Sequence, residues 1–361
     1  MKNGWQTKTL DLISTNLDSR RVPITKSVRA SGEYPYYGAS GIVDYVADYI
    51  FDEDTLLISE DGANLLARST SIAFPASGKY WVNNHAHILR FENTTTQRFV
   101  ELYLESIPLD EYITGAAQPK LNQKALNSIP IPVPPLPEQQ RIVGLLDEVF
   151  AGIATAKANA EKNLQNARAL FASYLQSALT ERGDGWVEKS LGETCEMYQP
   201  QTIGTKDLVP NGPYPVFGAN GIIGRYDKFN HEEPQLLVTC RGATCGSVNI
   251  SEPNSWITGN AMVVRPLDHS LDLKFLEFIF RGGIDISKAI TGAAQPQITR
   301  TNLSPLLIRF PKSVAEQTKL AEQFESLTEE TQCLASIYER KLAALEALKK
   351  SLLHQAFSGK L

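Results

Sequence analysis

A seven-residue run, Ile-Thr-Gly-Ala-Ala-Gln-Pro, occurs twice in this chain, at residues 113–119 and 290–296. Shorter matches keep the same order in both halves: Gly4-Trp5 with Gly185-Trp186, Gly38-Ala39 with Gly218-Ala219, Gly62-Ala63 with Gly242-Ala243, Trp81 with Trp256, Arg90 with Arg265, and Glu138-Gln139 with Glu316-Gln317. Self-similarity at a constant spacing indicates an internal duplication. We therefore expect each half to be one structural unit, and the function has to be explained by a pair of units.

Composition limits the class of protein. A chain of 361 residues is long enough for two or three domains with cores of their own. It has no apolar run of the roughly 20 residues that span a membrane, and its first residues lack the apolar core of a signal peptide. We expect a cytoplasmic protein without a membrane partner, whose four cysteines stay reduced. The net charge of −5 argues against a sequence-independent nucleic-acid binder, but it permits a sequence-specific one with locally placed cations.

Each half reads as a mixed segment followed by a long helix. The predicted domains cover 1–137 and 182–312, and the predicted spacer helices cover 138–181 and 313–361. Within the domains, short strands are predicted at 55–59, 87–91, 235–239 and 262–265, and short helices at 96–106 and 273–281. The proline-rich stretch 129–137 is expected to be extended and not helical.

The long helices carry the clearest periodic signal. Apolar or small residues recur in steps of three and four, a heptad pattern with one extra four-residue step. The first series is Ile142, Leu146, Val149, Ile153, Ala156, Ala160, Leu164, Ala167, Phe171, Tyr174 and Ala178. The second is Leu320, Phe324, Leu327, Thr331, Leu334, Tyr338, Leu342, Leu345, Leu348 or Lys349, Leu352 and Ala356. Helices of about 42 residues extend roughly 63 Å, and their stripes are expected to pack on each other; the alternative is that each helix covers its own domain.

These patterns predict an α+β fold. Two tandem α/β domains are joined by two long antiparallel coiled-coil helices, with a pseudo-two-fold internal repeat. Because the second helix returns toward the first domain, Leu361 is expected near Met1.

The motifs of several enzyme classes are missing. The sequence has no phosphate-binding Gly-x-x-x-x-Gly-Lys run, no dinucleotide-binding glycine motif and no motif of the kind that holds a flipped adenine. His85 and His87 could lie on one face of a strand, but no third ligand has metal-site spacing, so no metal site is predicted. No acid–base or nucleophile set recurs in both halves, which disfavours an enzyme.

The remaining signal is typical of nucleic-acid binding. Cations position a protein on phosphates, and Arg, Asn and Gln read base edges. The candidate contacts are Arg20, Arg21, Lys26, Arg29, Tyr36, Lys79, Gln118, Lys120, Lys124, Lys206, Arg225, Lys228, Arg241, Gln295 and Arg300. Each of the charges could equally be solvated surface charge.

Gln118 and Gln295 lie in the repeated run, next to Lys120 and near Arg300 respectively. The repetition is explained better by a shared loop conformation than by base reading. Gly115 and Gly292 predict unusual backbone angles in that loop.

At this point the chain resembles the specificity subunit of a Type I restriction–modification enzyme. The resemblance covers essentially the whole chain. It is carried by the Gly-Ala-Ala-Gln-Pro runs, by the sequence Ile-Pro-Val-Pro-Pro-Leu-Pro-Glu-Gln-Gln-Arg-Ile-Val at 131–143, and by Lys-Ser-Leu-Leu-His-Gln-Ala-Phe-Ser-Gly-Lys-Leu at 350–361. The second helix starts from a less proline-rich sequence than the first, which leaves the fold intact and bears on a partner contact there.

The resemblance implies two target-recognition domains, each reading one half of a bipartite, asymmetric site in double-stranded DNA, with the helices setting the gap. It implies no catalytic activity and no cofactor on this chain. Two methyltransferase subunits would bring S-adenosylmethionine, and restriction subunits would bring ATP and Mg²⁺ for translocation and cleavage. The alternative is a non-catalytic scaffold whose two domains bind protein ligands on a coiled-coil rod.

Overall fold

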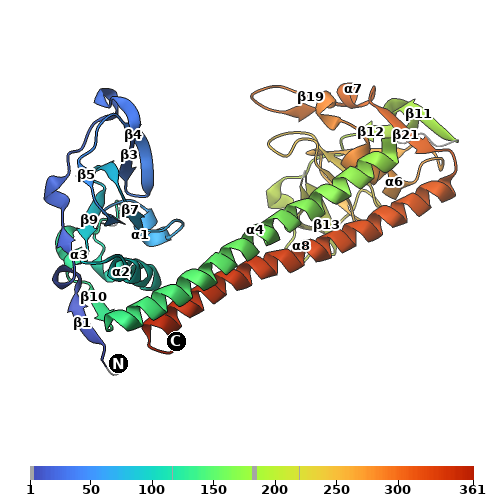
Figure 1. Cartoon of the computed structure of the whole chain (residues 1–361). Coiled ribbons are helices and arrows are strands. Elements are labelled where there is room, and N and C mark those ends of the chain that lie inside the picture. Colours follow the sequence, from blue (N-terminus) through green and yellow to red (C-terminus); the bar gives the residue numbers. More distant parts are fainter. Residues whose placement is uncertain (1–3, 116, 181–184, 219) are drawn as a thin grey trace. The chain divides into compact units, whose positions relative to one another are not determined.

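A computed structural model describes residues 4–115, 117–180, 185–218 and 220–361 (Figure 1). The chain forms two compact units. The first unit contains Met1–Ala160 and Arg340–Leu361, and the second contains Glu161–Glu339. Each unit holds one mixed segment and parts of both long helices, α4 (Leu136–Thr180) and α8 (Val314–Phe357).

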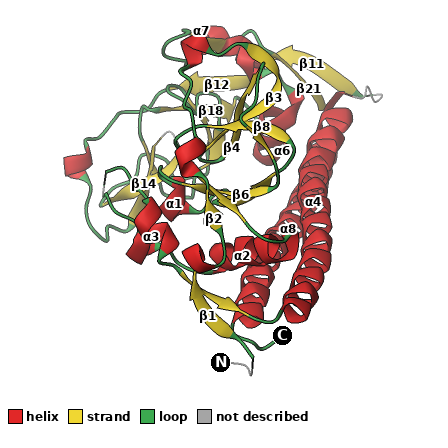
Figure 2. Ribbon diagram, turned by 60° about the vertical axis from the view of Figure 1, so that its left-hand side comes forward, coloured by secondary structure: helices red, strands yellow, loops and turns green. Residues whose placement is uncertain are grey.

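The first unit contains two four-stranded sheets and a two-stranded one (Figure 2). One sheet has the order β2 (Thr15–Asn16), β9 (Ala86–Arg90), β6 (Thr55–Ser59), β7 (Ala73–Ala76). The next has the order β4 (Gly41–Val46), β3 (Ser31–Gly38), β8 (Lys79–Val82), β5 (Phe51–Asp52), and β1 (Gln6–Thr9) pairs with β10 (Pro130–Val133). The α-helices besides α4 and α8 are α1 (Asn64–Ala67), α2 (Thr94–Ser106) and α3 (Gln123–Asn127).

The second unit repeats this plan. Its sheets have the orders β12 (Cys195–Tyr198), β18 (Ala261–Pro266), β15 (Leu236–Thr239), β16 (Val248–Ile250) and β14 (Gly221–Tyr226), β13 (Tyr214–Gly218), β17 (Trp256–Ile257). The two-stranded pairs are β11 (Trp186–Ser190) with β21 (Leu307–Pro311) and β19 (Ile290–Thr291) with β20 (Gln297–Ile298). Its short α-helices are α5 (Leu191–Thr194), α6 (Leu273–Phe278) and α7 (Arg300–Leu303).

The strand registers of the two units match. Leu56 lies opposite Leu89 in the first unit, and Leu236 lies opposite Val264 in the second. The parallel pairs β3–β8 and β13–β17 also correspond, and both hairpins carry a register shift at the same place, after Tyr36 and after Val216. Equal registers confirm the internal duplication, because a one-residue slip would turn every side chain to the other face.

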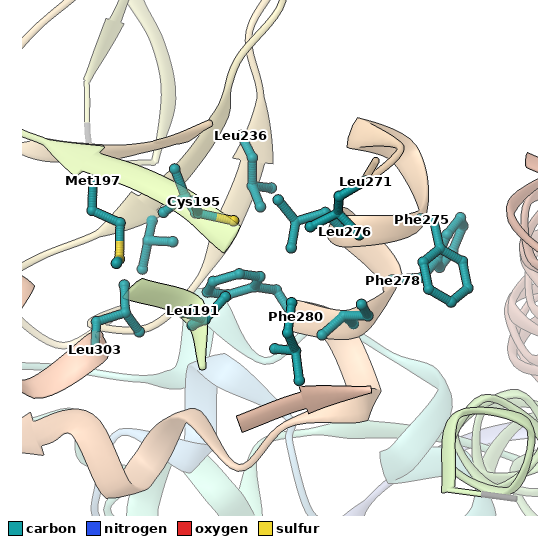
Figure 3. Close-up of a cluster of buried hydrophobic side chains, with 14 of the residues drawn as sticks. Leu191, Cys195, Met197, Leu236, Leu271, Phe275, Leu276, Phe278, Phe280 and Leu303 are labelled. Carbon is teal, nitrogen blue, oxygen red and sulfur yellow. The ribbon is translucent and has the colours of Figure 1, made fainter. Parts of the chain in front are cut away.

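Each unit has a core of its own that includes residues from both long helices. In the first unit, Leu56, Ile58 and Phe99 are joined by Ile142 of α4 and Leu353 of α8. In the second unit, ten of the core side chains are labelled in Figure 3, among them Leu236, Phe275 and Phe278. This core also takes in Leu175, Leu179, Ala321 and Phe324 from the helices.

The two helices pack antiparallel in both units. In the first, Lys157 binds Glu346 at 2.6 Å, and Lys349 lies over the ring of Phe150. In the second, Arg168 binds Glu339 at 2.9 Å. Residue numbers rise along α4 as their partners' numbers fall along α8, which confirms the predicted antiparallel pair; the alternative, in which each helix covers only its own domain, is wrong.

The predicted apolar stripe is confirmed along α4, but the buried face is wider than predicted at its end. Ile142, Leu146 and Ala167 are buried as expected. Tyr174 is 44% exposed but its ring contacts Phe324 of α8, Ala178 is half-buried, and Leu175 and Leu179, which lie outside the predicted series, are fully buried. These last turns pack on glycines of the second unit: a Cβ added to Gly282 would lie 2.7 Å from a Leu175 methyl carbon. The domain core therefore overrides the coiled-coil period here. In α8, Leu334 is 40% exposed, contrary to prediction. Of the two candidates Leu348 and Lys349, Leu348 is 46% exposed, and Lys349 is the one that contacts α4, over the ring of Phe150.

Two smaller expectations are settled near the helix ends. α4 begins at Leu136, so Pro137 is helical, contrary to prediction; proline fits the first turn because no amide hydrogen is needed there. The end of α8 lies beside the N-terminal strand, since Trp5 and Phe357 both contact the ring of Phe99. Met1 and the predicted boundary at 181–182 lie outside the described residues.

Within the described part of the chain, every helix is too short or too polar to cross a membrane.

Candidate nucleic-acid interface

The repeated seven-residue run forms the same loop in both units. In the first, Thr114 and Lys120 exchange backbone hydrogen bonds of 2.9 and 2.7 Å; in the second, Thr291 pairs with Gln297. Gly115 and Gly292 both have φ of +85°, and a Cβ on either would collide with the carbonyl oxygen three residues later. The predicted unusual backbone angles are confirmed, and they explain why glycine recurs at this position.

A second loop holds each of these loops. The amide of Gly62 donates to the Pro119 carbonyl at 3.0 Å, and that of Leu121 donates to Glu60 at 2.8 Å. In the second unit, Gly242 donates to Pro296 at 3.2 Å, and Ile298 donates to Cys240 at 2.9 Å. We call this pair of loops the two-loop frame: residues 60–62 with 114–121 in the first unit, and 240–242 with 291–298 in the second.

A buried ionic network lies under the first frame. His87 faces Asp18 through Nδ1 at 2.5 Å, and its Nε2 donates to the Leu121 carbonyl at 2.7 Å. Arg21 donates to Glu60 at 2.6 Å, and the Lys120 ammonium lies 3.1 Å from the same carboxylate. The network therefore holds Glu60 of one loop and Leu121 of the other, which are joined by a backbone hydrogen bond.

The network keeps its carboxylates ionised. Burial acts to raise the pKa of Asp18, but the hydrogen bond and charge of His87, the amide of Ile88 and the charge of Arg21 outweigh it and lower the pKa. For Glu60, burial is likewise outweighed, by Arg21, His87 and Lys120, and its pKa is lowered. Ordered cations and amide hydrogens stabilise the charged form of each acid.

This cluster fits an ion-pair network better than a metal site. Asp18, Glu60 and His87 place one potential ligand atom each within 4.8 Å of one another. Both nitrogens of His87 already have partners, and the Glu60 oxygens face Arg21 and Lys120. His85 does not join this cluster, because its ring binds Asp61 at 2.8 Å.

The second frame has uncharged residues at the corresponding places. Met262 lies opposite Val238 as His87 lies opposite Ile58, and Cys240 occupies the position of Glu60. Burial raises the pKa of the Cys240 thiol, which keeps it protonated. Above these residues lies a cavity of about 250 Å³, whose lining includes Tyr198, Gln199, Arg241, Gln297, Thr299 and Arg300.

The frames gather some of the predicted contact residues. Gln118 and Lys120 lie in the first frame, and Lys124 follows it in α3. Arg241 and Gln295 lie in the second frame, and Arg300 begins α7 directly after it. All six are exposed.

Other predicted residues lie away from the frames. Arg20 binds Glu53 at 2.5 Å, and Arg29 binds Asp44 at 3.0 Å. Lys79 stacks on the ring of Tyr49. Arg225 donates to the carbonyls of Gly212 and Pro213. Lys26, Lys206 and Lys228 are exposed on separate turns.

Two predicted residues belong to the interior. Tyr36 is fully buried, and its hydroxyl bonds the backbone of Ile24, so the expectation that its ring contacts a ligand is corrected. Arg21 is only 15% exposed, and its donors go to Glu60, Asp18 and the Ala86 carbonyl. β3 contains three tyrosines, and the sequence alone does not show which of their rings is buried.

Sequence reasoning missed several residues beside the frames: the exposed Gln123, Gln199 and Gln297, and the half-buried Asp61 and Tyr198. Gln297 carries a usable signal, because it follows the repeated proline as Lys120 does in the first half. The positions of the other residues beside the frames follow only from the strand pairing in the structure.

With the fold and both frames described, comparison with known proteins defines the class. The family model for the Type I restriction modification DNA specificity domain matches residues 2–165 and again 183–340. The chain therefore belongs to this family, and it contains the domain twice.

Similar proteins carry corresponding names. A Haemophilus influenzae protein that bears the name of a type I restriction enzyme specificity subunit is 39% identical over 144 residues, which is 40% of this chain and 37% of that protein. The Escherichia coli EcoprrI specificity subunit is 28% identical over 215 residues, 55% of this chain and 53% of that protein. The matched regions thus span about half or less of these relatives.

Solved structures share the fold. A chain from work on complex assembly and conformational transition of the type I R-M system has a TM-score of 0.77 at 17% identity, covering 100% of this chain and 99% of that one. The HsdS subunit of Thermoanaerobacter tengcongensis has a TM-score of 0.59 at 16% identity, covering 100% and 98%. These likenesses show that the chain shares the fold of these proteins.

Proposed function

We propose that this chain is the DNA-recognition subunit of a Type I restriction–modification complex. Each unit reads one half of a bipartite, asymmetric site in double-stranded DNA. The observation that carries the proposal is the pair of frames: their backbone hydrogen bonds agree, while the exposed side chains on them differ. A constant scaffold with different side chains suits two domains that read different short sequences.

The proposal assigns the chemistry to partners in the cytoplasm. Two methyltransferase subunits carry S-adenosylmethionine and methylate adenine, and restriction subunits use ATP and Mg²⁺. This chain holds none of these cofactors and contributes specificity. The family of the matched domains supports this division, because its description concerns DNA specificity.

The contact residues are proposed in two groups. Gln118, Lys120 and Lys124 act with the first frame, and Arg241, Gln295 and Arg300 act with the second. Arg20, Lys26, Arg29 and Lys79 in the first unit, with Lys206, Arg225 and Lys228 in the second, serve as phosphate contacts outside the frames.

The test is selection from random DNA. The purified chain is mixed with the methyltransferase subunit encoded beside it, and bound DNA is sequenced. We expect two short conserved blocks separated by a gap of fixed length. A pool without sequence preference, with and without the partner, would contradict the proposal and would favour the protein-interaction scaffold.

A further inference from the structure

Three side-chain positions occupy the same places on both frames. The first is Asp61 in one unit and Arg241 in the other, each directly before the glycine that binds the repeated proline. The second is Lys120 and Gln297, each directly after that proline. Backbone bridges join Asp61 to Lys120 and Arg241 to Gln297, so the two places correspond in three dimensions.

The third position begins a short helix beside each frame. Gln123 is the first residue of α3, and Arg300 is the first residue of α7. Asn122 and Thr299 precede them and accept hydrogen bonds from the backbone three residues later, at 2.9 and 3.3 Å. Equal capping places the two side chains equivalently. We call Asp61, Lys120 and Gln123 the first triplet, and Arg241, Gln297 and Arg300 the second triplet.

The triplets differ sharply in hydrogen-bonding character. The first combines a carboxylate, an ammonium and an amide, with no net charge. The second combines two guanidinium groups and an amide, with a net charge of +2. Two domains with one backbone frame thus present different donors and acceptors at the same three places.

The second triplet is also open to a ligand. Its three residues are exposed and line one cavity of about 250 Å³. Within the described part of the chain, the guanidinium groups of Arg241 and Arg300 make no ion pair and no hydrogen bond. Each guanidinium group has five donors, so the pair offers a dense set of donors with little internal competition.

The chemistry of base edges matches these differences. Guanine presents two acceptors, O6 and N7, in the major groove, and an arginine fork binds both. Arg241 and Arg300 therefore suit guanine. Asp61 has no such freedom, because its side chain is only 16% exposed and both of its carboxylate oxygens contact the His85 ring.

We propose that the two triplets determine which bases each unit prefers, with Arg241 and Arg300 reading guanine in the second unit and no residue of the first triplet doing so. This inference rests on the proposed function, because it assigns base preference to residues of the same interface. Gln118 and Gln295 are the same residue in both frames, so as contacts they do not distinguish the two half-sites.

The most informative variants keep the positive charge of each arginine and change the geometry of its hydrogen-bond donors. Arg241→Lys and Arg300→Lys retain the cation but lose the two-pronged donor. The full chain with its methyltransferase partner is used, and bound DNA is selected from a random pool. We expect each variant to lower the preference for guanine at one position of one half-site about tenfold, with the slope of affinity against salt unchanged and the other half-site unaltered.

Exchange of the triplets gives the second test. Asp61→Arg with Lys120→Gln and Gln123→Arg should move guanine preference into the first half-site. The reverse set, Arg241→Asp with Gln297→Lys and Arg300→Gln, should remove it from the second, and either set suffices if the other does not fold. Glu92→Arg is the matched control: it changes charge by +2 in the first unit, beyond the end of β9 remote from the frame, and should leave base preference as in the wild type.

Two results overturn the inference. Variants that bind more weakly but select the wild-type bases would make the triplets phosphate contacts only, while the proposed function stands. A wild-type complex that selects no sequence would remove the proposed function and this inference together.

Discussion

The side-chain amide of Gln139 donates to the carbonyl of Pro134 at 2.9 Å, across the turn that begins α4. Gln317 makes the same bond to Pro311 at 2.7 Å, at the start of α8. Both glutamines are buried. The Glu-Gln pair that recurs in the sequence is thereby explained: its second residue joins the end of a strand to the first turn of a long helix.

Removing this amide should destabilise the unit that holds it. Gln317 also donates to the Ser270 carbonyl and accepts from the Asp272 amide. Gln317→Ala leaves three backbone groups without their partner; the Pro311 carbonyl is buried, and the bonds to Ser270 and Asp272 are part-buried. An unsatisfied buried group costs about 1–3 kcal/mol, so we expect a loss of about 2–4 kcal/mol in the free energy of unfolding, measured by urea denaturation. Glu322→Gln, exposed on the same helix, should change it by less than about 0.5 kcal/mol.

The glycine of the repeated loop gives a second prediction. Gly292→Ala places a Cβ at φ of +85° and against the Gln295 carbonyl. We expect a loss of about 1–3 kcal/mol in stability and weaker DNA binding, because the loop must change conformation. Gly144 lies inside α4 with nothing within 4 Å of an added Cβ, so Gly144→Ala should stabilise the protein by about 1 kcal/mol. Equal melting temperatures for the two variants would contradict this account.

Much of the fold could be predicted from sequence because its signals are local or repeated. The strand 55–59 is observed as predicted, since β-branched and leucine residues form a short buried run there. The antiparallel helix pair follows from two apolar stripes of equal length. The end of α4 could not be predicted, because its core contacts depend on Gly282 and Gly283, which are about a hundred residues away in sequence.

The candidate interface was less predictable. The repeated run indicates where the interface lies, but it does not indicate which charged side chains are left without an ion-pair partner. Arg21 and Arg241 look alike in sequence, yet one is tied to Glu60 while the other is exposed on a frame. Burial and ion pairing depend on partners that are distant in the chain. The charge of a single residue therefore does not show whether its side chain is accessible to DNA.

Glu101 predicts a pH-dependent stability in the first unit. Burial raises its pKa from 4.5 to about 7, against the opposing charge of Arg98. The folded state then holds a proton that the unfolded chain has released, so the free energy of unfolding falls as pH rises from about 4.5 to 7 and is level above that. Glu101→Gln removes this slope. It should be more stable than the wild type at pH 8, by at most about 3 kcal/mol, and similar at pH 4.5.

Denaturant melts at both pH values measure the effect. Glu148→Gln is the control, since Glu148 is exposed on α4 in the same unit. A variant with the wild-type slope would show that Glu101 is ionised in the folded protein at pH 5.

The Asp18–His87 pair gives the last prediction. The pKa of Asp18 is lowered in the folded state, so its contribution to stability is present above its usual value of 3.8 and is lost as pH falls through the lower folded value. His87→Met alone leaves the buried Asp18 carboxylate without its main partner, which should cost about 3–5 kcal/mol at pH 7. It also frees the Leu121 carbonyl that His87 holds, so DNA binding at the first half-site should weaken.

Asp18→Gln with His87→Met copies the uncharged arrangement of the second unit, where Gln199 and Met262 occupy the equivalent positions. Because no unpaired charge remains, we expect the double variant to be about 1–3 kcal/mol more stable than the sum of the single changes implies. Its loss of stability on acidification should also be smaller, since one depressed carboxyl pKa is gone. A double-mutant cycle by urea denaturation at pH 7 and at about pH 3, below the usual aspartate pKa of 3.8, measures both quantities. Additive single effects at pH 7 would mean that the two residues act independently, and that the network does not hold the first frame as a unit.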